Sequence, residues 1–246
     1  MRNLYLISKE DLKNLVKNPM WLFYGTVFPI LLVVILGFLG KESYGGDVTA
    51  YDYYGITLII YAILTSGMTS ANAFMEVAIR KPNMRIIYAP GDAKAIYLSK
   101  IFSSFVFSSG CHLFDMILLC SIYHIHVSAI PQIMILFGLT ELFSVGLGVM
   151  FCCIFKTEAM ANQILSIVIN LFAILGGLLF PIDGYGKIAR TISYLSPAKW
   201  LVKATFAMIY DNNFRWFYYA VIGLILATAA VFIVCDKTFR KEDCIC

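Results

Sequence analysis

Four runs without a single charged residue constrain this chain more than any other feature. They cover residues 19–40, 53–75, 159–182 and 216–235. Each is close to the roughly 20 residues that a helix needs to cross a hydrocarbon core of about 30 Å. Two further runs, at 101–125 and 127–155, each contain one acid. The sequence therefore predicts six transmembrane helices, at 20–40, 53–75, 101–123, 131–155, 160–181 and 215–235.

Composition supports a membrane location. Charged residues make up 14% of the chain, whereas soluble proteins have about a quarter. A soluble domain of this length would need more polar residues to cover its surface. We therefore expect an all-α integral membrane protein in which residues 1–246 form one transmembrane domain.

The basic residues indicate the orientation of the helices, because Lys and Arg concentrate in cytoplasmic loops. With six spans, 13 of the 19 basic residues fall on one side of the membrane. We therefore expect both termini in the cytoplasm of a bacterial cell, with a multi-pass location in the plasma membrane. These basic residues are Arg2, Lys9, Lys13, Lys17, Arg80, Lys81, Arg85, Lys94, Lys100, Lys156, Lys237, Arg240 and Lys241.

One loop departs from this rule. Residues 183–215 should lie outside, yet they carry five basic residues against two acids. Apolar residues recur there at helical spacing, and Ser196-Pro197 has the form of an N-cap followed by proline at the first helical position. We expect two short extracellular helices within 183–213. A simple interfacial helix pair with Lys and Arg reaching towards water is the alternative.

The first 18 residues are amphipathic. Leu4, Ile7, Leu12, Leu15 and Val16 can face lipid while the charged residues between them face water. Asn18-Pro19 then breaks the helix before the first span. This pattern is typical of a helix that lies on the cytoplasmic membrane surface.

The sequence lacks the motifs of nucleotide and metal chemistry. No G-x-x-x-x-G-K-[ST] loop is present to bind ATP phosphates, and no H-E-x-x-H, G-x-S-x-G or paired C-x-x-C motif occurs. We expect no catalytic residue, no metal site, no cofactor bound by this chain and no nucleic-acid partner. Any nucleotide energy must come from another chain.

Three ionisable residues fall inside predicted spans: His112, Asp115 and Glu141. Such residues are costly in a membrane and usually face the bundle interior or a wet cavity. His112 and Asp115 are three residues apart and share a helix face. They and Glu141 could form a proton or cation relay, line a substrate path, or only fix helix packing through hydrogen bonds. With one His nearby, we do not expect a metal site.

Several short motifs occur in a characteristic order. "KNP" (17–19) precedes the first span, which contains "FPI" (28–30), and "APGDAKAIYLSKI" (89–101) follows the second span. "GGLLFP" (176–181), "ISYLSPAKWLVKA" (192–204) and a basic tail then follow. Over the whole chain this order resembles the ABC type-2 transporter permease family, the membrane subunits of ATP-driven exporters.

The resemblance implies partners and sites. It implies a dimer of permeases, identical or different, with two ABC ATPase subunits that bind ATP and Mg²⁺, all in membrane lipid. It also implies a cytoplasmic coupling helix at about 79–90 that contacts the ATPase, and an extracellular gate. The coupling residues would be Arg80, Lys81, Arg85, Ile86, Ile87, Tyr88 and Pro90. The gate residues would be Phe180, Pro181, Ser196, Pro197 and Trp200.

The sequence is compatible with more than one class of cargo. A hydrophobic or amphipathic cargo, such as a peptide, an antimicrobial or a drug, fits an apolar and aromatic-rich bundle better than a polysaccharide. Export of a lipid-linked polysaccharide is one alternative. A stand-alone channel or proton-coupled transporter that uses Asp115 and Glu141 is another. A membrane-embedded enzyme is disfavoured because no nucleophile and base pair is visible.

Overall fold

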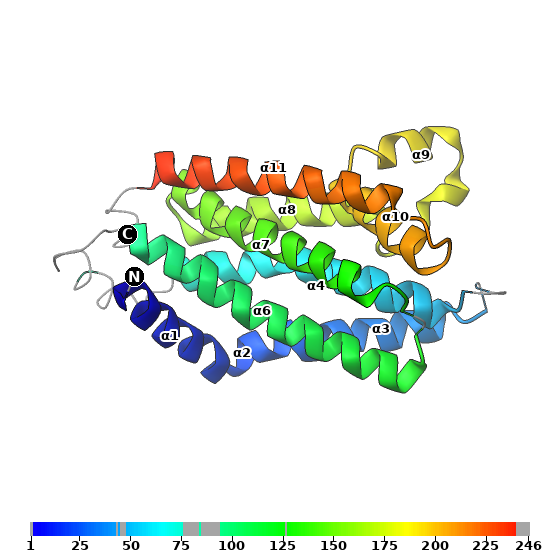
Figure 1. Cartoon of the computed structure of the whole chain (residues 1–246), viewed down its shortest axis with the longest axis horizontal. Coiled ribbons are helices and arrows are strands. Elements are labelled where there is room, and N and C mark those ends of the chain that lie inside the picture. The colour runs from blue at the N-terminus through cyan, green and yellow to red at the C-terminus, as the bar shows by residue number, and fades with distance from the viewer. Residues whose placement is uncertain are drawn as a thin grey trace.

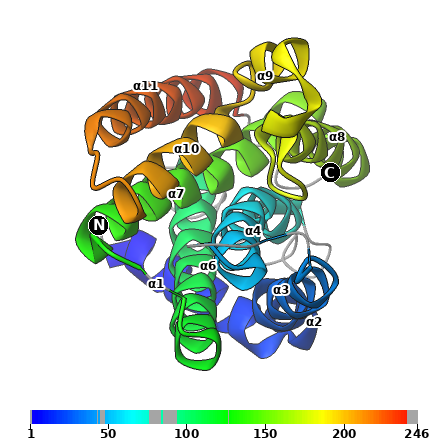
Figure 2. The same ribbon diagram turned by 90° about the vertical axis from the view of Figure 1, so that its right-hand side faces the viewer.

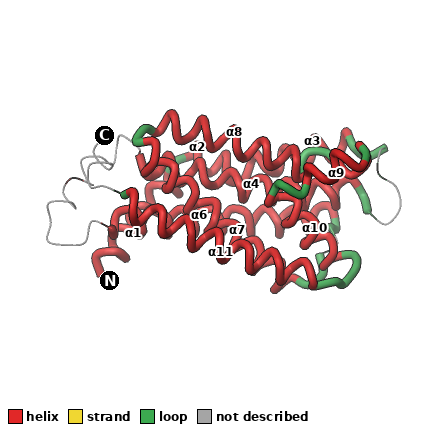
Figure 3. Tube along the Cα trace, turned by 90° about the horizontal axis from the view of Figure 1, so that it is seen from above, coloured by secondary structure: helices red, strands yellow, loops and turns green. Residues whose placement is uncertain are grey.

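The computed structural model describes residues 2–42, 44, 48–75, 84, 94–125 and 127–239. Within these residues the chain contains helices and no strand (Figure 3). The elements are α1 (Arg2–Lys17), α2 (Pro19–Leu22), the π-helical turn η1 (Phe23–Val27), α3 (Phe28–Leu39), α4 (Ala50–Met75), α6 (Lys94–Tyr123), α7 (Ile130–Phe155), α8 (Glu158–Gly176), the 3₁₀ turn η3 (Ile182–Tyr185), α9 (Lys187–Ser193), α10 (Pro197–Ile209) and α11 (Arg215–Thr238).

Six helical segments of the described chain are long and apolar enough to cross a membrane. They are the continuous stretch Pro19–Leu39, which joins α2, η1 and α3, followed by α4, α6, α7, α8 and α11. The prediction of an all-α membrane protein with six spans is confirmed. The protein is therefore a multi-pass membrane protein.

The six spans form one elongated bundle with α4 at its centre (Figures 1 and 2). Helix α4 packs against α3, α6, α7 and α8, and it is the most buried of the six spans. Helices α9 and α10 lie at one end of the bundle, whereas α1 and the last turns of α11 lie at the opposite end (Figure 1). The two ends of the molecule thus differ in structure.

The first span is irregular because it contains a proline. Pro29 lacks the N–H that would bond to a carbonyl one turn earlier. The π-helical turn η1 ends at Val27, two residues before Pro29. At the start of the span, the side chain of Asn18 accepts a hydrogen bond from the Met20 amide at 3.0 Å. This capping separates α1 from α2 at Asn18-Pro19, where the sequence predicts a break.

The fifth span ends earlier than expected, at Gly176 rather than at residue 181. Gly177 adopts φ +75°, and the Leu178 amide donates to the Ala173 carbonyl at 2.9 Å. This is a Schellman motif, which ends a helix by turning the chain into the left-handed region that glycine allows. The third span differs in the other direction. Helix α6 begins at Lys94 rather than at 101, and its 30 residues span about 45 Å, longer than a hydrocarbon core.

The N-terminal helix α1 turns one apolar face to protein rather than to lipid. Leu15, predicted to face lipid, is only 3% exposed and packs in a cluster with Ala73, Phe107 and Cys111. Val16 on the neighbouring face is exposed. The lipid-facing assignment is therefore wrong for Leu15, because α6 covers that face of α1.

Candidate functional site

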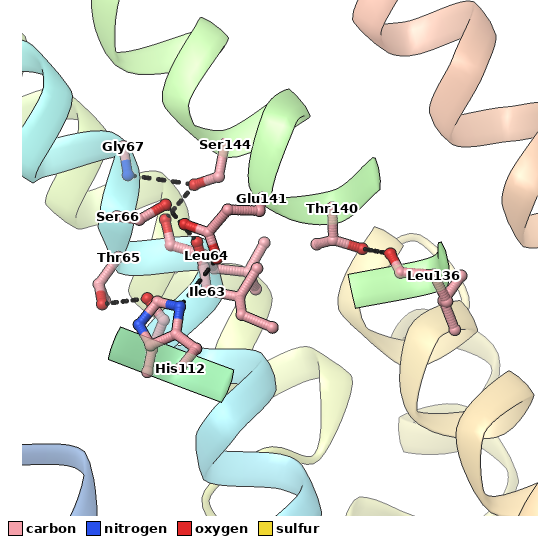
Figure 4. Close-up of polar contacts among 11 residues, drawn as sticks. Ile63, Leu64, Thr65, Ser66, Gly67, His112, Leu136, Thr140, Glu141 and Ser144 are labelled. Atoms are coloured by element: carbon pink, nitrogen blue, oxygen red, sulfur yellow. Dashed lines mark hydrogen bonds and ion pairs between the residues drawn. The ribbon is translucent and has the colours of Figure 1, made fainter. Parts of the chain in front are cut away.

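A buried histidine–glutamate contact lies where α6 and α7 meet. His112 Nδ1 is 2.8 Å from Glu141 Oε2, and the two residues are 6% and 1% exposed (Figure 4). Removing a charge from water is costly unless the charge finds a partner. The sequence placed His112 and Asp115 on one helix face, but the structure pairs His112 with Glu141 on a different helix.

Asp115 lies one turn further along α6 and is completely buried. Within the described residues, neither of its carboxylate oxygens has a hydrogen-bond partner, nor has Glu141 Oε1. The Lys and Arg side chains of the six spans all lie within two turns of a helix end. The cluster therefore contains two acids and one base. With His112 protonated and both acids ionised its net charge is −1, which one further proton or cation would neutralise.

His112 lies between two cavities. The smaller, of about 60 Å³, is lined by Ser109, Glu141 and apolar residues of α6 and α7. That volume holds about two water molecules. The larger, of about 400 Å³, lies between the first span, α4 and α6. His112 thus borders both the small pocket, which it shares with Glu141, and the large cavity.

The pair lies next to a close contact between α4 and α7. Ser144 Oγ accepts a hydrogen bond from the Gly67 amide at 3.2 Å and donates one to the Leu64 carbonyl at 2.6 Å (Figure 4). A Cβ atom on Gly148 would lie 1.9 Å from the Gly67 carbonyl oxygen. Small residues at 144 and 148 therefore let the two backbones approach closely, as in other membrane helix pairs.

The predicted gate residues divide into two groups. Ser196 Oγ donates to the Phe172 carbonyl at 2.8 Å, which fixes the start of α10 to α8. Pro197 and Trp200 line a cavity of about 390 Å³ between α10 and α11. Pro181 lines a different cavity, of about 550 Å³, and Phe180 is partly exposed. The structure therefore keeps Pro197 and Trp200 together on α10, next to its N-cap Ser196, but places Pro181 on another cavity.

The predicted coupling residues Arg80, Lys81, Arg85, Ile86, Ile87, Tyr88 and Pro90 lie outside the described residues. The helix that follows them, α6, is described from Lys94, and its start carries two ion pairs. Lys94 Nζ is 2.5 Å from Asp236 Oδ1 on α11, and Lys100 Nζ contacts Asp11 Oδ1 on α1. The start of α6 is thus connected to the first and last helices.

Sequence reasoning missed Asp11, although the sequence contains a signal. Asp11 lies four residues before Leu15 and three after Ser8, and all three are buried. That spacing puts an acid on the buried face of an amphipathic helix, where an acid requires a partner. Lys100 could not be identified as that partner, because helix packing alone brings the two residues together.

The family model for the ABC-2 type transporter matches residues 2–210, from α1 to the end of α10. The chain belongs to the ABC-2 type transporter family. No curated protein matches the sequence. As an ABC-2 family member, the chain is a membrane subunit of an ABC transporter and not itself the ATPase. Its family implies an ABC ATPase partner and a dimeric arrangement.

Proposed function

We propose that this ABC-2 permease exports a hydrophobic or amphipathic cargo, such as a peptide, an antimicrobial or a drug, using ATP hydrolysed by a separate subunit. The observation that carries this proposal is the cavity of about 400 Å³ between the first span, α4 and α6. Its volume falls in the range of pockets that bind small molecules.

The walls of this cavity have two chemical characters. The first span contributes Trp21, Tyr24 and Phe28, an aromatic and apolar wall. Helix α4 contributes Thr65, Thr69 and Asn72, which recur at i, i+4 and i+7 and therefore lie along one face. An apolar wall opposite a polar strip suits a cargo that is itself amphipathic.

The contacts at the start of α6 support a route for the force. In this proposal, closure of two ATPase subunits pushes the coupling segment at about 79–90, which lies just before α6. Helix α6 is joined to α1 through Asp11–Lys100 and to α11 through Lys94–Asp236. A push on that segment would move these helices together and shift His112, which lies further along α6. Both termini and the coupling segment are cytoplasmic in this arrangement.

Transport in proteoliposomes tests the cargo site. The permease is reconstituted with its ABC ATPase, and ATP-dependent movement of a fluorescent amphipathic peptide is measured. Tyr24→Ala should lower the transport rate because Tyr24 lines the cavity. Phe23→Ala is the matched control, since Phe23 on η1 is similarly exposed, at 43% against 49% for Tyr24, but is not among the residues that line the cavity. Equal rates for both variants and the wild type would reject this cavity as the cargo site.

Co-purification tests the coupling segment separately. Arg85→Glu and Ile86→Asp should each reduce ATPase binding, because one reverses a charge and the other places an acid in an apolar contact. If the ATPase stays bound with unchanged turnover in both variants, the coupling assignment is wrong.

The buried cluster favours a second candidate, a proton-coupled carrier that uses Asp115 and Glu141. Two acids and one His in the membrane interior provide a site for one exchangeable proton. Such a carrier would transport the probe peptide with a proton gradient and without ATPase or ATP. Transport that requires ATP and persists when the proton gradient is collapsed would exclude this candidate.

A further inference from the structure

The basic loop between α8 and α11 is an exception to the positive-inside rule, and the structure gives it a physical basis. Three of its five cations, Arg190, Lys199 and Lys203, line a single cavity of about 550 Å³. Asp211 is the one acid among the described residues that line it. The cavity lies at the end of the bundle that carries α9 and α10, which faces the viewer in Figure 2. Three of the five cations of the loop thus border one open cavity.

Two of these cations meet at one phenol. Lys203 Nζ donates to the Tyr194 hydroxyl at 2.9 Å and lies 3.7 Å from the centroid of the Trp216 ring. The hydrogen bond from Lys203 lowers the pKa of Tyr194, and Arg190 acts in the same direction. The Tyr194 hydroxyl and the face of the Trp216 ring contact Lys203 without supplying a carboxylate. The lining therefore keeps an excess of positive charge.

Lys199 adds a cation in a different setting. It is a buried residue of α10, with 7% of its surface exposed. Lys199 lines the same cavity as Arg190 and Lys203, so three cations border one space.

The surroundings of the cavity are apolar and aromatic. Ile188 on α9 and Leu195, which follows the end of α9, are each 78% exposed. Trp200 lies 5.5 Å from Trp216, and Trp216 lies 6.2 Å from Tyr219, measured between ring centroids. Trp and Tyr gather at the level of lipid headgroups. A ligand here would meet cations at one end and apolar side chains beside it.

We propose that this cavity binds the phosphate-bearing headgroup of an anionic membrane lipid of the phosphatidylglycerol class. Arg190 and Lys203 face the phosphate, since cations bind phosphate through short charge-assisted hydrogen bonds. The acyl chains lie along Ile188 and Leu195. The exposed apolar residues favour a lipid over a free anion, which would leave them in water. This site is separate from the proposed cargo cavity.

Lipid titration of the purified full chain in detergent tests the proposal. Trp21→Phe provides the background, so that only Trp200 and Trp216 report by fluorescence. Dihexanoyl-phosphatidylglycerol should bind saturably and at least about tenfold more tightly than dihexanoyl-phosphatidylcholine, because the latter has no net charge to match the cations. Inorganic phosphate is titrated as the free-anion probe and should bind more weakly.

Charge variants localise the effect. Arg190→Gln and Lys203→Gln should each weaken phosphatidylglycerol binding by about tenfold. Lys203→Arg should retain binding, which separates loss of charge from loss of fold. Lys187→Gln is the matched control, because Lys187 is an exposed cation of α9 outside the cavity lining.

Each contrary result overturns the proposal. Equal affinity for the two lipids would remove the role of charge. An equal loss in Lys187→Gln would indicate diffuse surface attraction rather than a site. Inorganic phosphate that binds as tightly as the lipid would assign the cavity to a free anion.

Discussion

The ammonium group of Lys100 on α6 donates a hydrogen bond to Oδ1 of Asp11 on α1. The two side chains are 2% and 10% exposed. Ser99 Oγ donates to the other carboxylate oxygen at 2.9 Å. These contacts fix the N-terminal helix to the start of α6, next to the segment proposed to receive force. The surface helix expected from its amphipathic pattern is therefore also a structural part of the bundle.

Removing one partner of this pair should destabilise the protein. Asp11→Leu leaves the Lys100 charge buried without a counter-charge and should lower the free energy of unfolding by about 3 kcal/mol. The double variant Asp11→Leu with Lys100→Met should recover most of that loss, because neither charge remains buried. Thermal unfolding of the purified protein in detergent measures both.

A neighbouring ion pair provides the control for this prediction. Glu10 and Lys13 form an exposed pair at 3.3 Å on the opposite face of α1. Glu10→Leu should change stability by less than about 1 kcal/mol, because water already solvates both charges. If Asp11→Leu costs no more than Glu10→Leu, the buried pair does not hold α1 in place.

The close approach of α4 and α7 gives a second prediction. A methyl group at Gly148 would collide with the Gly67 carbonyl oxygen, and backbone atoms cannot rotate away. Gly148→Ala should therefore lower the free energy of unfolding by at least about 1–3 kcal/mol. Gly138→Ala on the same helix meets nothing within 4 Å and should be neutral or stabilise by up to about 1 kcal/mol. Similar melting temperatures for the two variants would contradict the observed α4–α7 contact.

A third prediction concerns the end of α8. The Tyr53 hydroxyl on α4 donates to the Gly177 carbonyl at 2.5 Å, so it contacts the residue that ends the helix. Tyr53→Phe keeps the ring but removes this bond, and it should cost about 1–2 kcal/mol. Amide hydrogen exchange at residues 177–182 should also become faster. Tyr218→Phe, at an exposed position of α11, should change neither measurement; equal effects would show that the Tyr53 bond has no special role.

The six spans could be predicted from the sequence because crossing a membrane is a property of a local segment. A run of about 20 uncharged residues satisfies that requirement without knowledge of its neighbours. The two short helices were also visible locally, and α10 begins at Pro197, just after the predicted N-cap Ser196. Helix ends were less predictable. The Schellman turn at Gly177 stopped α8 before its apolar sequence ended.

The contacts between helices could not be predicted, because they depend on how the helices pack. Nothing local links His112 to Glu141, 29 residues away, or Asp11 to Lys100. The sequence identifies three buried ionisable groups. Which of them pair depends on how α6 and α7 are oriented about their axes, and the sequence does not give that orientation. The basic loop shows the same limit: its excess charge was visible, but its cavity was not.

The buried cluster gives the last prediction. Glu141→Gln and Asp115→Asn each keep the shape of the side chain and remove one ionisable acid. Either change leaves one acid beside His112, so a protonated His112 balances the charge of the cluster without a further proton or cation. Both variants should assemble, and both should lower ATP-dependent transport of the probe peptide if the cluster lines the path or carries a proton.

Thr140→Val is the control for that experiment. Thr140 is buried next to Glu141 in the chain, but its hydroxyl donates only within α7, to the Leu136 carbonyl at 2.8 Å (Figure 4). The variant Thr140→Val removes a buried polar group outside the cluster, and it should leave transport unchanged. Undiminished transport in both acid variants would limit Asp115 and Glu141 to helix packing. Because His112 lies on the wall of the proposed cargo cavity, loss of transport in the acid variants alone would connect that cavity to the cluster.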